Sequence, residues 1–472
     1  MEFEGQGVLV LGFGVSGRSA AKFCAERGAQ VVVADERPSD RESTEDAQAF
    51  AAGISGRVEL RLGEAFPKLS DFDLVVPSPG IPEARWAGQA KRVWGDIELC
   101  YRALQVPVIA VTGTNGKSTV VRLIEAMAQA AGLRARAAGN LGIPALALVG
   151  EALDVAILEV SSFQLESVDA FKPRTAVLLN LSPDHLDRHG DLEGYRAAKE
   201  KIFARQTAGD AAILNGDDPL TASIELAGDA ERLEFRRHIV GRATGIAIED
   251  AVVAASTDGA WLDGRNAIVR RDGQQHSVSI DGAVKHDGGR AGGQSQQDEN
   301  VLAALLAVAT LNTDLNAATG ALADFRGLPH RCERVAELGG VLFIDDSKAT
   351  NVGAAIRALE SIPNPILWIA GGRHKGGTLT ELVASAEGRV KRALLIGEAA
   401  SELRSALGER VEHEELEQMD RAVARAAELA APGDVVLLSP ACASFDQFSS
   451  FEDRGRRFQA AVKTLETKRG HV

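Results

Sequence analysis

The chain has 472 residues, of which 45% are hydrophobic and 25% charged, and its formal net charge is -14 at pH 7. At roughly 150 residues per domain, this length predicts about three domains. The acidic balance leaves no basic surface for a nucleic acid, so we expect no nucleic-acid partner. The four cysteines have no C-x-x-C spacing, which disfavours a zinc site or a disulfide framework.

The N-terminal residues run directly into a predicted strand without a basic leader region. No apolar run approaches the ~18 residues that a membrane span needs. We therefore expect a cytoplasmic protein that does not bind a membrane.

The first hundred residues begin with a βαβ pattern. A strand over residues 8–11 is followed by the G-x-G-x-x-G spacing of residues 12–17, a helix to Arg27, and a strand over residues 31–34 that ends at Asp35. Taken alone, this pattern indicates a dinucleotide, with Asp35 holding a ribose.

The space available weakens the dinucleotide interpretation. A third strand is predicted over residues 74–76, before the turn at 77–80, and a break follows near residues 104–107. A full dinucleotide fold has roughly six strands, which this length does not favour. Half of a Rossmann sheet suits a nucleotide-sugar diphosphate at least as well.

The most informative segment is residues 112–119, TGTNGKST, which lies between an apolar run at 106–111 and a helical pattern at 120–131. Gly113 and Gly116 let backbone N–H groups approach an anion, and Lys117 neutralises phosphate charge. The hydroxyl of Ser118 or Thr119 binds Mg²⁺ in such loops. We interpret the segment as a phosphate-binding loop, although it is shorter than the usual G-x-x-x-x-G-K-[ST].

Further strands at residues 155–160, 176–180 and 211–215 alternate with helical patterns such as 195–204, which predicts a parallel α/β sheet. Short β-branched runs between residues 233 and 280 predict a small antiparallel β appendage. We expect a surface loop at 288–297, a buried helix at 301–311, and the end of the domain near Gly327.

The last segment again alternates strands and helices, with strands predicted at residues 341–344, 366–370, 393–396 and 435–438. Ligands bind beyond the carboxyl ends of such strands. The loops expected there are rich in small and polar residues: 345–351, 371–376 and 439–444.

Three further positions carry possible chemistry. Glu159 ends an apolar strand, where a carboxylate needs a cation, either nucleotide-bound Mg²⁺ or an arginine. His185 and His189 have i,i+4 spacing, but Leu186 replaces the glutamate of H-E-x-x-H, so we do not expect a zinc protease. One of these imidazoles lies near Mg²⁺ or substrate, or else in a solvated turn. Lys199 by pattern alone is a solvated helix lysine.

Taken in order, the motifs resemble those of the ATP-dependent Mur ligases of peptidoglycan synthesis. The resemblance spans essentially the whole chain and rests on these segments: 12–19, 78–81, 95–99, 112–119, 139–142, 158–166, 184–189, 195–199, 327–331, 345–351 and 439–448. Within the family, DDSKATN at 345–351 and SPACASFDQF at 439–448 resemble the D-glutamate-adding member.

The resemblance implies three α/β domains. Residues 1–104 would form a Rossmann-like domain for the UDP-sugar, residues 105–327 a central ATPase domain, and residues 328–472 a Rossmann-like domain for the amino acid. The implied enzyme is a ligase that adds D-glutamate to UDP-N-acetylmuramoyl-L-alanine through an acyl phosphate. Peptidoglycan synthesis in turn implies roles in cell-wall biogenesis, cell shape and cell division, and most relatives act as monomers.

The resemblance also implies roles for individual residues. The UDP-sugar would contact Ser16, Arg37, Ser78, Pro79, Gly80, Asn140 and His185. ATP would contact Gly113, Thr114, Asn115, Gly116, Lys117, Ser118, Thr119, Asn300, Arg331, Asp346 and Lys348. D-Glutamate would contact Thr350, Lys375, Ser444 and Phe451.

Two Mg²⁺ sites are implied, one at Ser118 and Glu159 and a second at His185 and Lys199. Lys199 matches the family's N-carboxylated lysine, which reverses the interpretation from pattern alone. Carboxylation needs a neutral amine and therefore a site that lowers the lysine pKa. The implied catalytic residues are Lys117, Glu159, His185 and Lys199.

Two segments depart from the family pattern. Gln296 and Gln297 replace a usual His-Asn pair ahead of Asn300, which affects contacts to the nucleotide base. Arg373 and His374 stand before Lys375, where an acidic residue is usual, so we expect a more positive D-glutamate pocket.

Three alternatives remain open at this stage. The nearest is another ligase of the superfamily, adding a different amino acid or extending folate with glutamate. A nucleotide-binding sensor without catalysis would lack Lys117, Glu159 or Lys199, and all three are present. An NAD-dependent oxidoreductase would use residues 12–35.

Overall fold

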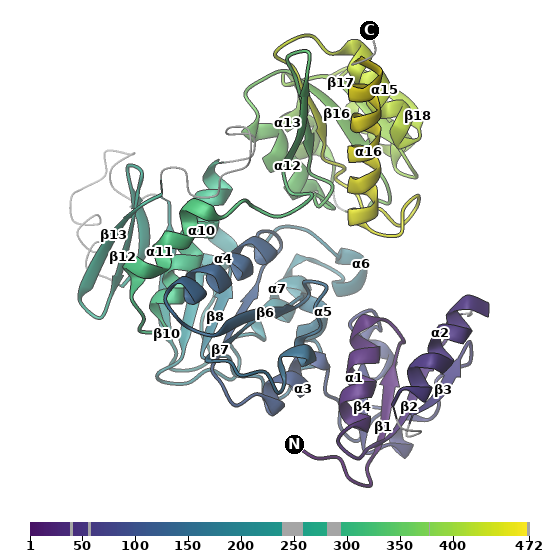
Figure 1. Ribbon diagram of the computed structural model, residues 1–472, viewed down its shortest axis with the longest axis vertical. Coiled ribbons are helices and arrows are strands. Elements are labelled where there is room, and N and C mark those ends of the chain that lie inside the picture. Colours follow the sequence, from purple (N-terminus) through teal and green to yellow (C-terminus); the bar gives the residue numbers. More distant parts are fainter. Residues whose placement is uncertain (38–40, 55–57, 238–257, 281–293, 377, 470–472) are drawn as a thin grey trace. The chain divides into compact units, whose positions relative to one another are not determined.

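The computed structural model describes residues 1–37, 41–54, 58–237, 258–280, 294–376 and 378–469 (Figure 1). The chain forms three sheets, each combined with helices, as the α/β prediction requires. It divides into two compact units. The first comprises Met1–Leu181, Glu193–Val278 and Leu302–Gly320, and the second comprises Ser182–Leu192, Ser279–Val301 and Ala321–Val472.

The N-terminal sheet is parallel and has the strand order β3-β2-β1-β4. Its strands are β1 (Gly7–Leu11), β2 (Gln30–Asp35), β3 (Val58–Leu62) and β4 (Leu74–Pro77). The helices of this region are α1 (Val15–Ala25), α2 (Arg41–Ala52), η1 (Leu69–Asp71), η2 (Glu83–Arg85) and α3 (Asp96–Ala103). Four strands are fewer than a full dinucleotide fold uses, which favours the half-Rossmann interpretation.

Two buried carboxylates hold α3 in place. Glu98 accepts the backbone N–H groups of three consecutive residues, 169–171, at 2.9–3.0 Å. Gln164 Nε2 donates to both carboxylate oxygens of Asp96, at 3.1 and 3.3 Å. The backbone N–H of the next residue, Ile97, also donates to Asp96. Burial raises the pKa of Asp96 despite these hydrogen bonds and one from Ser16. The helix is therefore held by two carboxylates of segment 95–99, to which the sequence analysis assigned no role of their own.

The central sheet has nine strands in the order β13-β12-β11-β10-β9-β8-β5-β7-β6. They are β5 (Val108–Thr112), β6 (Ala135–Gly139), β7 (Val155–Glu159), β8 (Thr175–Leu178), β9 (Ala211–Asn215), β10 (Glu231–Arg236), β11 (Gly259–Asp263), β12 (Asn266–Arg271) and β13 (Gln274–Ser279). The helices are α4 (Lys117–Ala130), η3 (Ala145–Leu148), α5 (Ser162–Leu165), α6 (Leu186–His189), α7 (Leu192–Glu200), α8 (Pro219–Ala222), α10 (Gln294–Ala309) and α11 (Leu315–Asp324).

The expected β appendage is built as an extension of this sheet. β10 pairs in parallel with both β9 and β11, whereas β11 pairs antiparallel with β12. Residues 238–257 of the expected appendage lie outside the described residues. The loop expected at 288–297 is wrong for its last four residues, because α10 already begins at Gln294, and 288–293 lie outside the description.

The C-terminal sheet has the order β14-β15-β19-β16-β17-β18, with β14 antiparallel to β15 and the other pairs parallel. Its strands are β14 (Glu333–Leu338), β15 (Val341–Asp345), β16 (Ile366–Gly371), β17 (Val390–Ile396), β18 (His413–Glu417) and β19 (Val435–Leu438). The helices are α12 (Val352–Ser361), α13 (Thr380–Ala386), α14 (Ala400–Leu407), α15 (Met419–Leu429) and α16 (Phe451–Arg469).

Both faces of this sheet are covered, which explains the nearly continuous apolar runs of its inner strands β15, β16, β17 and β19. Ile344 and Trp368 pack in one buried cluster, whereas their chain neighbours Phe343 and Ile369 pack in another. This alternation is the period of two that a strand imposes on its side chains. The sheet is thus a rigid base for the loops at its carboxyl ends.

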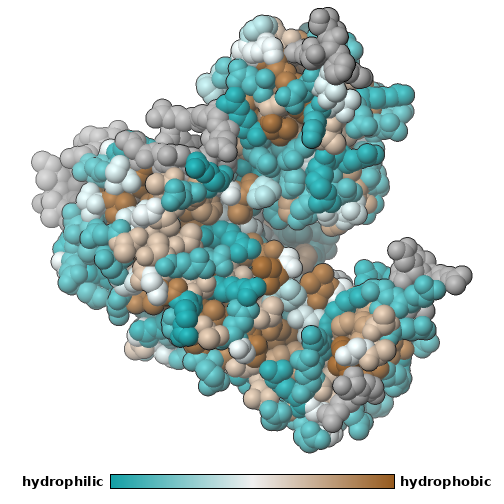
Figure 2. All heavy atoms as spheres, viewed as in Figure 1, coloured by the Kyte–Doolittle hydropathy of each residue, from teal (hydrophilic) through white to brown (hydrophobic). Residues whose placement is uncertain are grey.

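Hydrophilic residues predominate on the face drawn in Figure 2, and hydrophobic residues appear there in scattered spots. Among the described residues the exposed large hydrophobic side chains are Met1, Val15 and Phe445. No helix in the described part of the chain has the length and apolarity needed to cross a bilayer.

Candidate active site

The phosphate loop follows β5 and opens α4, as predicted. Gly113 and Gly116 have φ values of 149° and 90°, which favour glycine. A Cβ atom at Gly113 would also approach Leu179 Cβ to 3.0 Å. Since α4 begins at Lys117, its first N–H groups face the loop as an anion site.

Asn180, which follows β8, fixes the shape of this loop. Its side chain accepts the Asn115 N–H at 2.8 Å and donates to the Asn115 carbonyl oxygen at 3.1 Å. Its own carbonyl oxygen accepts the Thr114 N–H at 2.9 Å. The neighbouring strand end therefore templates the loop backbone, a role that the sequence pattern did not indicate.

Two lysines converge on one atom of the loop. Lys117 Nζ donates to the Gly113 carbonyl oxygen at 2.7 Å, and Lys199 Nζ donates to the same oxygen at 3.0 Å. Lys199 is only 1% exposed and also lies 3.4 Å from Thr112 Oγ1. The pattern-based expectation of a solvated Lys199 is therefore wrong, because α7 buries this side chain against the loop.

Glu159 lies beside the loop, since β7 pairs with β5 in a register that matches Glu159 with Val111. Its Oε1 accepts Asn140 Nδ2 at 2.9 Å, whereas its buried Oε2 has no hydrogen-bond partner among the described residues. Asn140 is thus the hydrogen-bond partner of Glu159 in that part of the chain, and the arginine alternative is not supported. Thr119 Oγ1 is likewise buried without a partner there. An open carboxylate oxygen and hydroxyl groups are ligands that suit Mg²⁺.

The N-terminal glycine turn is locked to the end of β2 by Asp35. This carboxylate accepts the Phe13 N–H at 2.8 Å and both Nε and Nη2 of Arg37, at 3.0 and 2.6 Å. Although burial raises the pKa of Asp35, these hydrogen bonds outweigh it and lower the pKa to about 2. Because Asp35 is held by the chain's own groups, a ribose-binding role for it is disfavoured.

Ser78, at the end of β4, lies against the same turn. Its hydroxyl donates to the Gly12 carbonyl oxygen at 3.3 Å. A Cβ atom at Gly17 would collide with that carbonyl and approach the Ser78 hydroxyl to 2.9 Å, so the third glycine is needed for close packing. The structure thus brings Ser78 and the glycine turn together, with Val15 exposed at the start of α1.

Asp184 gathers groups within the second unit. Asn351 Nδ2 donates to it at 2.9 Å, and Lys375 Nζ lies 3.6 Å from its other oxygen. His185 Nε2 is 3.7 Å from Asp184, and His185 has a left-handed φ of 54° at the start of α6. The expected roles of His185 and Lys375 toward substrates stay predictions.

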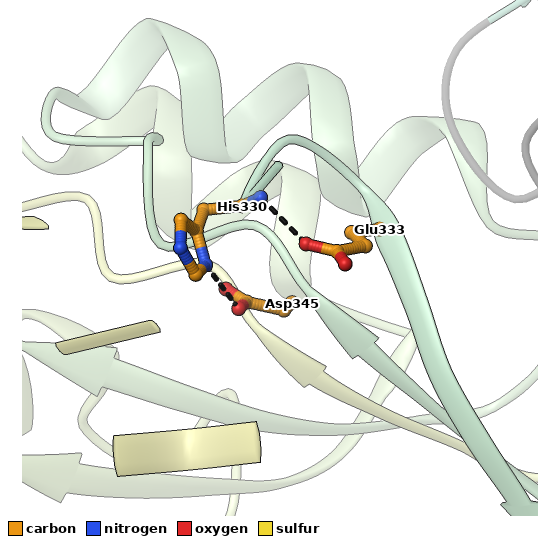
Figure 3. A group of neighbouring side chains, drawn as sticks. All are labelled: His330, Glu333 and Asp345. Carbon is orange, nitrogen blue, oxygen red and sulfur yellow. Dashed lines mark hydrogen bonds and ion pairs between the residues drawn. The ribbon is translucent and has the colours of Figure 1, made fainter. Parts of the chain in front are cut away.

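His330 and Asp345 form a buried pair, with Nδ1 2.7 Å from Oδ2 (Figure 3). The same carboxylate accepts Gln459 Nε2 at 2.9 Å, and Glu333 accepts the His330 backbone N–H at 2.7 Å. The hydrogen bond to Asp345 raises the pKa of His330. This network fixes the turn that carries the neighbouring Arg331.

Asp346 is buried at the end of β15. It accepts the Cys332 N–H at 3.2 Å and the Ser439 hydroxyl at 2.9 Å. Burial raises its pKa to about 6, although the Ser439 hydrogen bond and the charge of Arg331 act in the opposite direction. Two residues expected at ATP, Arg331 and Asp346, are therefore electrostatically coupled.

Arg454 joins three of the expected ligand loops and was missed by the sequence analysis. Its buried guanidinium donates to the Ser347 hydroxyl and carbonyl at 3.0 and 2.9 Å, and to the Cys442 carbonyl at 3.0 Å. A longer contact of 3.4 Å reaches Gly371. Burial lowers the pKa of Arg454 to about 10.

Phe451 connects an expected ATP residue with the expected amino-acid pocket. The Lys348 ammonium lies 3.8 Å from its ring centroid, and the Ser347 hydroxyl donates to its carbonyl oxygen at 2.8 Å. Ser444 is buried nearby in sequence, and its carbonyl accepts the Phe448 N–H at 2.9 Å. The proposed ligand contacts of Asn300, Thr350 and Ser444 remain predictions.

Comparison with protein families gives three consecutive matches: "Mur ligase MurD-like, N-terminal domain" at residues 6–93, "Mur ligase middle domain" at 111–307, and "Mur ligase, glutamate ligase domain" at 330–442. The chain belongs to the Mur ligase family. Curated Mur ligase relatives include the UDP-N-acetylmuramoylalanine--D-glutamate ligases of Pelotomaculum thermopropionicum and Geobacter metallireducens. Both are 39% identical, with 98% and 99% of this chain and 99% of each relative covered.

Solved structures of Mur ligases and related enzymes share the fold. A pseudomurein peptide ligase type C from Methanothermus fervidus matches with a TM-score of 0.58 at 16% identity, over 98% of this chain and 100% of that one. E. coli FolC in complex with DHPP and ADP matches with a TM-score of 0.56 at 19% identity, over 83% and 100%. The fold is therefore common to several ligases.

We predict that Asp346→Asn stabilises the protein in a pH-dependent way. Because the folded-state pKa of Asp346 lies above its ordinary value, ionising this carboxyl costs folding free energy. The cost is absent below about pH 4, grows as the pH rises to about 6, and is then constant. The free energy of unfolding of the variant minus that of the parent should therefore be larger above pH 6.5 than at pH 4, by on the order of 2–3 kcal/mol.

Urea unfolding at a series of pH values measures this difference. Asp420→Asn, at an exposed position of α15, is the matched control and should show no comparable trend. A stability difference for Asp346→Asn that does not change with pH would contradict the assignment.

Proposed function

We propose that this chain is an ATP-dependent ligase that joins D-glutamate to UDP-N-acetylmuramoyl-L-alanine in peptidoglycan precursor synthesis. The observation that carries the proposal is the convergence of Lys117, Lys199 and Glu159 on one phosphate loop, in a Mur ligase chain whose full-length relatives bear that ligase name. The family further implies a monomer acting in the cytoplasm.

In the first step, a carboxylate oxygen of the L-alanyl group attacks the γ-phosphorus of ATP. The bond from this phosphorus to the β,γ-bridging oxygen breaks, ADP departs, and an acyl phosphate is formed. Phosphoryl transfer depends mainly on positioning and on charge stabilisation. The loop N–H groups hold the phosphates, and Lys117 places a positive charge beside them.

In the second step, the D-glutamate amine attacks the acyl carbon to give a tetrahedral intermediate. The carbon–oxygen bond to phosphate then breaks, inorganic phosphate leaves, and the nitrogen loses a proton as the amide forms. Lys375, Thr350, Ser444 and Phe451 form the proposed D-glutamate pocket. A lysine and hydroxyl groups suit a dicarboxylate, since charge-assisted hydrogen bonds to carboxylates are strong.

The proposed UDP-sugar site uses the carboxyl edge of the N-terminal sheet. Ser16 lies in the first turn of α1, and Arg37 and Ser78 follow β2 and β4. Hydrogen bonds to Asp35 and to the Gly12 carbonyl oxygen tie these strand ends to the glycine turn before α1. This arrangement supports a diphosphate on the glycine turn, because glycines there leave room for close approach of the backbone. Asn140 and His185 complete the proposed set.

Ser118 and Glu159 would hold one Mg²⁺ ion, and His185 and N-carboxylated Lys199 a second. When bound, the metal neutralises charge on the transferring phosphoryl group. Carboxylation would leave one N–H on Lys199 Nζ, which is enough to keep the 3.0 Å hydrogen bond to Gly113. The modified side chain would then present a carboxylate where the unmodified one presents only donors.

The test of the function is ADP release from Mg-ATP and UDP-N-acetylmuramoyl-L-alanine with D-glutamate, L-glutamate, L-alanine or a dicarboxylate without an amine. We expect release that depends on D-glutamate and on the acceptor. Release with another amino acid or a folate acceptor would keep the ligase chemistry and refute the proposed substrates. No release with any pair would favour a nucleotide sensor.

We predict that Lys199→Ala abolishes turnover and that a short carboxylic acid partly restores it, because the acid would replace the missing carbamate. The neighbouring Lys201→Ala variant, whose lysine contacts the Glu166 carbonyl, should remain active. Carbon-13 NMR in labelled bicarbonate should show a carbamate signal that Lys199→Ala lacks. Full activity of unsupplemented Lys199→Ala, or a carbamate signal in it, would exclude this role.

A further inference from the structure

The loop that carries Lys375 has two side chains directed to the start of α14. Arg373 forms a two-pronged pair with Glu398, at 2.9 and 3.0 Å, and His374 Nδ1 lies 2.9 Å from Glu402 Oε1. Both side chains come from the loop that follows the carboxyl end of β16. Their partners are four residues apart, at and just before the first turn of α14.

The backbone before His374 is already rigid. Arg373 exchanges two hydrogen bonds with Ala443, at 2.8 and 2.9 Å, and the Ala399 N–H donates to the Gly372 carbonyl at 2.8 Å. A Cβ atom at Gly372 would collide with the Ala443 carbonyl, so this backbone approach is close. Among the described residues, 374–376 form no backbone–backbone hydrogen bond, and the side-chain contacts of this stretch are those of His374 with Glu402 and of Lys375 with Asp184.

The two ion pairs differ in environment. Arg373 and Glu398 are each 55% exposed, and such surface pairs contribute little. The His374 side chain is only 10% exposed, and its Nε2 is buried without a hydrogen-bond partner among the described residues. Glu402 therefore anchors an imidazole that has little other polar contact, directly before Lys375.

We infer that the His374–Glu402 pair is a positioning device that orients Lys375 and thereby sets the affinity for D-glutamate. The carboxylate of Glu402 accepts from Nδ1–H, and the buried ring then fixes the backbone from which the next side chain projects. The inference rests on the proposed function in one respect, namely that Lys375 binds the amino-acid substrate.

The test compares steady-state kinetics of Glu402→Ala, His374→Ala and the matched control Glu398→Ala, which breaks only the exposed pair. We expect the first two to raise the KM for D-glutamate about five- to tenfold, a size typical of coupling between neighbouring residues. The KM values for ATP and the UDP-sugar should stay unchanged, and so should the melting temperature of Glu402→Ala, whose deleted side chain is 54% exposed. Glu402→Gln, which keeps an acceptor oxygen, should restore most of the affinity.

A Lys375→Met background shows whether the pair acts through Lys375. We expect Lys375→Met alone to raise the KM for D-glutamate, and Glu402→Ala to add nothing in that background. Additive effects, or equal effects of Glu398→Ala and Glu402→Ala, would overturn the inference. An unchanged KM in Lys375→Met would instead refute the Lys375 assignment itself.

Discussion

The structure depends on one arrangement, which is the phosphate loop held between the ends of three parallel strands. β5 supplies the loop, β8 is followed by Asn180, which templates its backbone, and β7 ends in Glu159 beside it. Parallel pairing forces these carboxyl ends onto one edge of the sheet. Residues far apart in sequence therefore meet at this edge. Lys199 and Lys117, for example, donate to the same carbonyl oxygen, that of Gly113.

The buried charges divide into those that complete the scaffold and those that leave an atom open. Glu98, Asp345 and Arg454 are satisfied by protein groups and therefore fix helices and loops. Glu159 keeps a buried oxygen without a partner among the described residues, which is costly unless a ligand supplies the missing contact. This contrast distinguishes Glu159, which we propose as a metal ligand, from carboxylates such as Glu98 and Asp345.

The sequence predicted the strands that are buried on both faces, such as β5, β7 and β16, since their apolar runs are continuous. It did not predict β3, β14 and β18. These strands lie at sheet edges and contain charged residues, so their sequences look like those of loops. The prediction from pattern alone that Lys199 is solvated was wrong, because periodicity does not show which face of a helix another loop covers. Asn180 and Arg454 were missed because most of their partners are backbone atoms, which no sequence pattern records.

The central claim is that the chain activates a carboxylate by phosphoryl transfer at this loop. The most direct test follows oxygen-18 placed in the alanyl carboxylate of the UDP-sugar substrate during turnover with Mg-ATP and D-glutamate. An acyl phosphate transfers one labelled oxygen to inorganic phosphate for each amide formed, so we expect phosphate carrying a single oxygen-18. Amide formation with unlabelled phosphate would contradict the account.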